Sequence, residues 1–204
     1  GVDVFFVISG FLITTIVTDK VSKGKFSLKE FYLSRVSRIV PAYYFMVFVV
    51  SIASIFVYFN FDIEKILRRE LIYVLGFTSN NYFANLGTYF GASLLENPFL
   101  HTWTLGVEMQ FYFILPFLLL IIRKPNFAIF VFFILTILLF SYGTYNIYIA
   151  KDVTSTYFSL LARIPEFLIG SLVSFIGKDW FTNKKILTNV LAAIGLGLIL
   201  FSSF

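Results

Sequence analysis

The sequence contains no cysteine, a single histidine and few charged residues. Without cysteine, its 204 residues offer no disulfide, no thiol nucleophile and no thiolate metal ligand. One histidine and scattered carboxylates argue against a structural metal site, and we expect no bound metal or cofactor. Charged residues make up 13% of the chain, below the share in soluble domains. The net charge of +5 is small and needs no nucleic-acid partner.

Hydrophobic residues dominate instead. They make up 59% of the chain and give it a mean hydropathy of +0.89, which is typical of a multi-pass membrane protein. The 28 Phe suit lipid-facing and packed surfaces, and the 12 Tyr suit membrane interfaces, where an apolar ring and a polar tip are both satisfied. We therefore predict an all-α, polytopic transmembrane helical bundle.

Six apolar runs are predicted to span the bilayer, whereas Leu71–Phe83 is too short to be a seventh span. Gly76 and the polar residues 78–81 interrupt this run, which predicts a re-entrant or interfacial segment. Six spans also place the Lys- and Arg-rich linkers on the cytoplasmic side, an alternation that a seventh crossing would break. The predicted spans are residues 1–17, Ile39–Phe59, Thr104–Ile122, Phe127–Ile149, Tyr157–Ile176 and Ile186–Phe204.

One carboxylate, Glu108, lies near the start of the third span. The helical period places His101, Thr104, Glu108 and Tyr112 along one stripe of this helix. Ionisable groups in lipid face the bundle interior or a wet cavity and mark function by default. Glu108 is therefore the first candidate for a catalytic residue, with His101 and Thr104 beside it. The alternative is that Glu108 only joins helices through an arginine partner.

Two arginines precede the second span, in the most basic loop of the chain. Ser27 and Glu30 have the spacing of a helix cap and its partner, which predicts a surface helix running into the span, with Pro41 in the first turn of that span. Arg35 and Arg38 lie one turn apart on this helix and share a face suited to binding phosphate oxygens. Ordinary anchoring by positive charge explains them equally well.

The fifth span holds two opposite charges, Arg163 and Glu166, three residues apart and near mid-membrane. Pro165 lies between them, where a helix can bend and free backbone groups for polar contacts. The pair is either functional or a self-satisfied ion pair, which this spacing suits.

Small residues predict two places where helices approach closely. They are Ser9 with Gly10 in the first span, and Gly170 in the fifth. Asp3, at the rim of the first span, is either a residue that favours the start of a helix or a functional one.

Four segments, taken in order, carry a set of motifs. They are residues 1–14 (GVDVFFVISGFLIT), 31–41 (FYLSRVSRIVP), 101–112 (HTWTLGVEMQFY) and 163–170 (RIPEFLIG). Together they resemble the successive motifs of the membrane-bound acyltransferase 3 family, the bacterial O-acyltransferases of lipopolysaccharide, peptidoglycan and other envelope glycans. The resemblance covers most of the chain, and the first and third motifs are highly specific.

The resemblance implies a bundle of about ten spans in the bacterial cytoplasmic (inner) membrane. Such a protein transfers an acyl group, usually acetyl, from cytoplasmic acetyl-CoA or another acyl-CoA to a hydroxyl of an extracytoplasmic glycan. Arg35 and Arg38 match the family's Arg-x-x-Arg pair, which implies that they bind the acyl-CoA.

The resemblance also implies roles inside the membrane. Trp103 and Thr104 match the family's Trp-Ser pair, with the hydroxyl kept. Arg163 and Glu166 match positions that the family keeps. We expect Arg163, Glu166, Trp103 and Tyr112 to give polar support within the bundle.

The family's proposed catalytic histidine belongs to a span that precedes this sequence, and His101 does not match it. We therefore expect residues 1–204 to be a partial acyltransferase domain, lacking spans at both ends and inactive by itself. In the intact protein the two arginines would position the donor, while Glu108, Thr104 and His101 would orient or polarise the acceptor. The arginines would lie at the inner edge and Glu108 toward the outer one, so either the acyl group crosses the bundle or the cavity is deep.

A transporter or flippase for lipid-linked saccharides is the rival prediction, because it too uses charges and broken helices within the membrane. No inverted repeat is visible in the sequence, and the four ordered motifs argue against it. A non-catalytic membrane sensor or anchor would leave Glu108, Arg163 and Glu166 without purpose.

Overall fold

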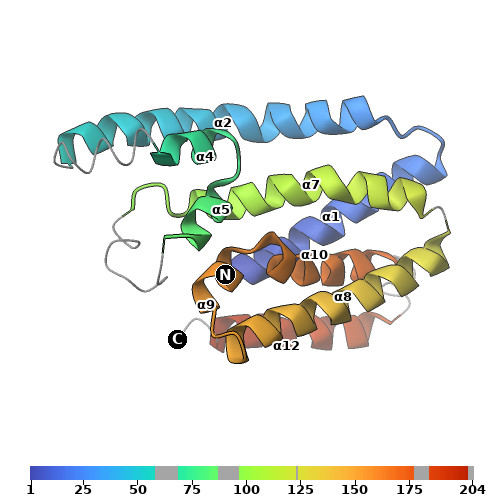
Figure 1. The fold of residues 1–204 in the computed structure, drawn as a ribbon. Helices are drawn as coiled ribbons and strands as arrows, with labels where there is room; N and C mark the ends of the chain where they lie inside the picture. Colours follow the sequence, from blue (N-terminus) through green and yellow to red (C-terminus); the bar gives the residue numbers. More distant parts are fainter. Residues whose placement is uncertain (58–68, 87–96, 123, 177–183, 202–204) are drawn as a thin grey trace.

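The structure, a computed structural model, describes residues 1–57, 69–86, 97–122, 124–176 and 184–201. Every regular element in these ranges is a helix, which confirms the predicted all-α class (Figure 1). The helices are α1 (Val2–Ser22), α2 (Leu28–Val57), α4 (Leu71–Leu75), α5 (Ser79–Ala84), α7 (Thr102–Ile121), α8 (Pro125–Tyr148), α9 (Val153–Phe158), α10 (Leu160–Ser174) and α12 (Lys185–Phe201). Figure 1 shows α2 along one side of the bundle and α8 along the other, with α7, α1 and α10 between them.

Four of the six predicted spans form helices long and apolar enough to cross a membrane, namely α1, α2, α7 and α8. The other two predicted spans form shorter helices, since α10 has 15 residues and α12 has 17. The prediction of one helix over Tyr157–Ile176 is wrong, because the extended backbone of Ser159 (φ −67°, ψ 129°) separates α9 from α10. Asp152 starts α9 as a separate helix by accepting a hydrogen bond from the backbone N–H of Ser155.

The predicted surface helix and the second span form one continuous helix, α2. Its start is capped as predicted, with the backbone N–H of Glu30 donating to the Ser27 hydroxyl at 3.4 Å. Pro41, however, lies inside the helix and not in its first turn, because α2 already begins at Leu28. The proline removes one backbone hydrogen bond there without ending the helix.

The segment Leu71–Phe83 forms two short helices, α4 and α5, and neither is long enough to cross a membrane. The chain turns between them at Phe77, whose φ of 54° lies in the left-handed region. The Phe77 carbonyl accepts a hydrogen bond from the Gln110 side chain at 2.9 Å. A methyl group at Gly106 would lie 3.0 Å from the same oxygen, so the turn is pressed against α7. The Phe77 carbonyl of the turn is thus satisfied by a side chain of α7.

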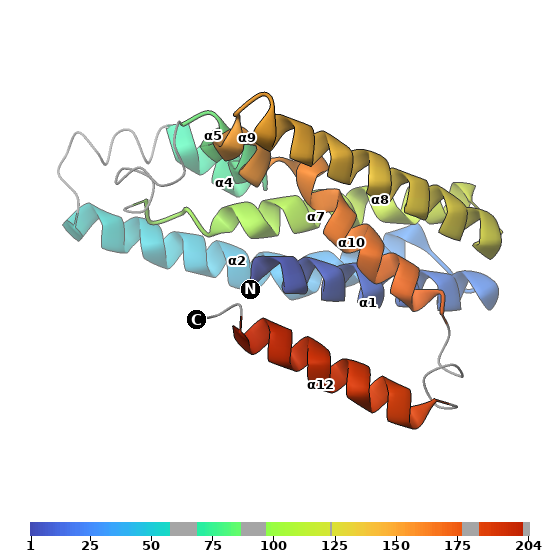
Figure 2. The ribbon, with the colours of Figure 1, turned by 90° about the horizontal axis from the view of Figure 1, so that it is seen from below.

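The closest helix packing is between α1 and α10, and Figure 2 shows α10 crossing α1 at an angle. A methyl group at Gly10 would lie 2.0 Å from the carbonyl oxygen of Phe167, and one at Gly170 would lie 1.9 Å from that of Val7. The two helices therefore meet backbone to backbone through a reciprocal pair of glycines. This confirms the predicted close approach, which in lipid stabilises helices by packing.

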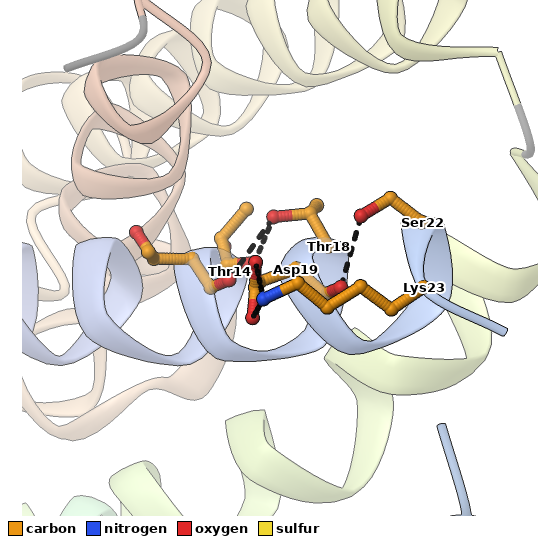
Figure 3. A network of polar contacts seen from close by, with 6 residues as sticks. Thr14, Thr18, Asp19, Ser22 and Lys23 are labelled. Carbon is orange, nitrogen blue, oxygen red and sulfur yellow. Dashed lines mark hydrogen bonds and ion pairs between the residues drawn. The ribbon is translucent and has the colours of Figure 1, made fainter. Parts of the chain in front are cut away.

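Polar side chains at the other end of α1 are satisfied within the helix (Figure 3). The Thr18 hydroxyl donates to the Thr14 carbonyl at 2.7 Å, and the Ser22 hydroxyl donates to the Asp19 carbonyl at 2.9 Å. Lys23 forms an exposed ion pair with Asp19, with 2.7 Å between nitrogen and oxygen. Such local bonds let hydroxyl residues occupy a membrane helix without partners on other helices.

Replacing Gly10 with alanine tests the importance of the glycine contact. We expect Gly10→Ala to lower the free energy of unfolding by about 1–3 kcal/mol, because α1 and α10 must move apart. The matched control is Gly195→Ala on α12, where an added methyl group meets no heavy atom within 4 Å. Thermal unfolding of the detergent-solubilised full-length protein measures both. Equal unfolding midpoints for the two variants would contradict the claim that this contact between α1 and α10 stabilises the bundle.

Candidate functional site

Glu108 lies buried on α7, with a relative exposure of 6%, and hydroxyl groups hold its carboxylate. Ser9 on α1 donates to Glu108 Oε1 at 2.7 Å, and the Tyr112 hydroxyl donates to the same oxygen. The hydroxyls of Tyr112 and Ser9 are themselves 3.3 Å apart. The three side chains form one polar cluster between α1 and α7, which we call the Glu108 cluster.

No arginine pairs with Glu108 among the residues that the structure describes. The carboxylate does join two helices, but through the Ser9 hydroxyl and not through the arginine partner of the alternative prediction. Neutral hydroxyl donors stabilise a buried carboxylate without cancelling its charge. Both of these hydrogen bonds go to Oε1, so Oε2 keeps its capacity to accept a further hydrogen bond.

Arg35 lies over the ring of Tyr112. Its guanidinium carbon is 5.8 Å from the Tyr112 ring centroid and 5.6 Å from that of Phe31. The Arg35 Nε is buried and has no hydrogen-bond partner among the described residues. Arg38, predicted to share a face with Arg35, is exposed, whereas Arg35 is half-buried. Arg35 thus offers a donor next to the Glu108 cluster.

His101 and Thr104 do not join the Glu108 cluster. His101 precedes α7 and is exposed. The Thr104 hydroxyl donates to the His101 carbonyl at 2.9 Å and so bonds within its own turn. The seven residues from His101 to Glu108 amount to about 10 Å of helix rise. Of the predicted stripe, only Tyr112 therefore bonds to the Glu108 carboxylate.

Arg163 forms the centre of a second polar cluster, with Asp3 and Glu166. Its Nη1 lies 3.0 Å from Asp3 Oδ1 and 3.2 Å from Glu166 Oε1, so the predicted pair with Glu166 is present. Arg163 ends the first turn of α10 and Glu166 lies in the second, because the helix begins only at Leu160. Asp3 belongs to the first turn of α1, so these charges lie at one end of the bundle.

Aromatic rings surround the Arg163 guanidinium group. Its carbon lies 4.5 Å from the ring centroid of Tyr157 and 5.6 Å from that of Trp103, and its Nε donates to the Tyr157 carbonyl at 2.9 Å. Trp103 is 2% exposed. The expected role of Trp103 beside an intramembrane charge thus has a geometric basis in cation–π contact.

Ser9 and Glu70 are among the buried polar groups that the sequence did not predict. For Ser9 the sequence predicted only a place of close helix approach. The helical period of the buried positions of α1, which include Ser9, is the signal that could have predicted its burial. Glu70 is 1% exposed, and the Asn97 amide donates to its Oε2 at 2.7 Å. Near it, burial and, secondarily, the charge of Glu70 raise the pKa of Tyr82 above its ordinary value. Neither contact has a local signal, since the partners lie 99 and 27 residues apart.

The described residues contain no group of three His, Cys, Asp or Glu side chains placed to hold a metal ion. The two polar clusters consist of carboxylates, hydroxyls and guanidinium groups. Such groups can position and polarise a substrate and move its protons.

Comparison with known proteins gives a family match over the whole chain. Residues 1–204 match the family model Acyl_transf_3, described as an acyltransferase domain. An uncharacterized protein of Haemophilus influenzae is 38% identical over 98% of this chain and 84% of its own length. No solved structure matches.

Two named relatives are longer proteins. The peptidoglycan O-acetyltransferase OatA of Listeria monocytogenes is 32% identical over 100% of this chain and 35% of its own length. The O-acetyltransferase OatA of Staphylococcus aureus is 29% identical over 96% of this chain and 33% of its own length. The chain thus spans about a third of each OatA protein.

Removing the Tyr112 hydroxyl tests how the Glu108 carboxylate is held. We expect Tyr112→Phe to lower the free energy of unfolding by about 1–3 kcal/mol, because a buried carboxylate loses a donor that water cannot replace. The matched control is Tyr145→Phe on the exposed surface of α8, for which we expect a change within about 0.5 kcal/mol. Unfolding in detergent measures both variants, and equal changes would contradict this account of Glu108.

Proposed function

Because the chain belongs to the acyltransferase 3 family, we propose that it forms part of an integral membrane O-acyltransferase of the bacterial inner membrane. The enzyme would move an acyl group, acetyl in the first instance, from cytoplasmic acyl-CoA to a hydroxyl of an extracytoplasmic glycan. Peptidoglycan is the first acceptor to test, since it is named for the Listeria relative. The observation that carries the proposal is the contact of Arg35 with Tyr112, which connects a cationic group to the buried Glu108 carboxylate.

On the donor side, we assign Arg35 and Arg38 to the phosphates of acyl-CoA. Guanidinium groups bind phosphate oxygens with paired N–H donors, and the Arg35 Nε has no protein partner among the described residues. Arg38 is exposed on the same helix and adds positive charge on the solvent side. The half-buried Arg35 would bind one end of the phosphate group and Arg38 the other.

On the acceptor side, we assign Glu108 to the hydroxyl that becomes acylated. The hydroxyl oxygen attacks the thioester carbonyl, its proton passes to a base, and CoA leaves as the thiol while an ester forms. Ser9 and Tyr112 hold Glu108 Oε1, which leaves Oε2 to orient the acceptor. Thr104, about one turn earlier, and His101, about two turns earlier, would contact the acceptor farther from the reacting bond.

The rival function, a transporter or flippase for lipid-linked saccharides, would use the same intramembrane charges. It would need no acyl donor. Acyl-CoA-dependent transfer of label to glycan therefore separates the two functions directly.

The first test supplies labelled acetyl-CoA to the full-length protein in membrane vesicles and follows label into peptidoglycan. We expect Arg35→Ala to raise the KM for acetyl-CoA by roughly tenfold or more, and Arg35→Lys to restore part of the loss, because lysine keeps the charge without the guanidinium fork. The matched control is Lys29→Ala, which removes an exposed charge from the same helix. An equal rise in the KM for acetyl-CoA in the Lys29→Ala control would mean that the positive charges only anchor the loop. Absence of transfer by the wild type, with several donors and glycans, would favour the transporter.

Replacing the carboxylate tests the acceptor side. We expect Glu108→Gln to lower kcat by roughly 100-fold with little change in the KM for acetyl-CoA, because the amide keeps the shape but cannot take a proton or carry charge. The amount of inserted protein and its thermal midpoint are measured in parallel. A kcat close to that of the wild type would remove Glu108 from the reaction.

A further inference from the structure

A cavity of about 340 Å³ lies between α8, α9 and α10 and contains no residue of the Glu108 cluster. Its volume is within the range of small-molecule sites, about 300–1,000 Å³. Arg163 and Glu166 form part of its wall, so it lies at the end of the bundle that contains Asp3. By the count of spans and charged linkers, this is the extracytoplasmic end.

Glu166 brings an unsatisfied oxygen to this cavity. Its Oε1 pairs with Arg163 at 3.2 Å, while its Oε2 is buried and has no partner among the described residues. A buried carboxylate oxygen without a hydrogen-bond donor raises the free energy of the folded protein. A ligand that supplies such a donor is therefore bound favourably. The Arg163 charge beside it repels a cationic donor. The matching group is therefore a neutral one, such as a hydroxyl.

The rest of the wall suits a polyhydroxylated ring better than a lipid tail. Phe140, Tyr148 and Tyr157 contribute aromatic rings, and Ile147, Val153 and Ile169 contribute aliphatic side chains. The hydroxyls of Thr144 and Thr156 donate to carbonyls four residues earlier and can still accept a hydrogen bond from a ligand. Sites of this kind combine apolar surface with a few polar groups that fix orientation. A hydrocarbon chain would fill the apolar part but would leave Glu166 Oε2 without a donor.

We propose that this cavity binds a saccharide unit of the acyl acceptor, with Glu166 Oε2 accepting a hydrogen bond from one of its hydroxyls. The inference rests on the proposed function for the identity of the ligand. It gives Glu166 a direct contact with the acceptor, in addition to its ion pair with Arg163. The acceptor is thus recognised at the outer end of α10, apart from the donor arginines on α2.

The test measures binding and turnover of one probe, the soluble N-acetylglucosamine–N-acetylmuramic acid disaccharide, with the full-length protein in vesicles. Saturation-transfer NMR gives the Kd, and labelled acetyl-CoA gives the KM for the disaccharide. We expect Glu166→Gln to raise both by roughly tenfold, and Thr144→Trp to abolish binding by filling the cavity. The KM for acetyl-CoA should change less than about twofold.

Matched controls separate the cavity from its surroundings. Asp3→Asn removes the other carboxylate that pairs with Arg163 but does not line the cavity. Ser141→Trp adds the same bulk as Thr144→Trp at an exposed position of α8 outside the cavity. We expect both controls to change the disaccharide Kd by less than about threefold. A change in Asp3→Asn equal to that in Glu166→Gln would place the effect at Arg163 and overturn the proposal.

The remaining outcomes distinguish this inference from the proposed function. Transfer by the wild type, with unchanged disaccharide Kd and KM in Glu166→Gln, would overturn the cavity site and leave the acyltransferase intact. If the wild type transfers no acyl group, the binding measurement decides alone. Saturable binding that both cavity variants lose supports a saccharide site, and absence of saturable binding overturns it. If the Thr144→Trp variant does not insert into the membrane, the disaccharide Kd of Glu166→Gln alone decides whether the cavity binds the saccharide.

Discussion

The backbone contact between α1 and α10 is the constraint on which both polar clusters depend. Gly10 and Gly170 each face a backbone carbonyl of the other helix so closely that a methyl group would overlap with it. Lipid gives helices little hydrophobic reason to associate, so close packing of this kind must stabilise the pair. Ser9 directly precedes Gly10 and meets Glu108, and Asp3 lies two turns earlier and meets the guanidinium group of α10. Moving α1 away from α10 would disturb both contacts together.

Aromatic side chains separate the two polar clusters. Phe6 lies between Asp3 and Ser9 in α1, and its ring stacks on that of Phe167 with 4.6 Å between centroids. Phe167 in turn stacks on Phe111 at 4.1 Å. Water is excluded from such a layer, so each cluster must satisfy its own charges. Hydroxyls bond the Glu108 carboxylate, whereas two carboxylates pair with the Arg163 guanidinium group and leave one buried oxygen, Glu166 Oε2, without a donor among the described residues.

The sequence predicted contacts within a helix better than contacts between helices. Glu108 and Tyr112 lie four residues apart, so the helical period alone brings them together. The Ser9 contact depends on how α1 is rotated against α7, and no local pattern specifies that rotation. The break at Ser159 was missed because the apolar run continues across it, and no glycine or proline marks this position. The contacts at the two glycines were predicted because small residues in a membrane helix usually mark a place where another helix packs closely.

The sequence suggested that the arginines and Glu108 lie at opposite edges of the membrane, but the structure reduces this separation. The Tyr32 hydroxyl donates to the Phe113 carbonyl at 2.9 Å, which fixes the start of α2 beside the middle of α7. Because α7 continues for eight more residues, or about 12 Å, Arg35 lies within the length of the bundle. One phenol ring then stands between the guanidinium group and the Glu108 carboxylate. A cation over the face of a phenol also makes its hydroxyl a better donor, so the charge of Arg35 strengthens the bond that holds Glu108.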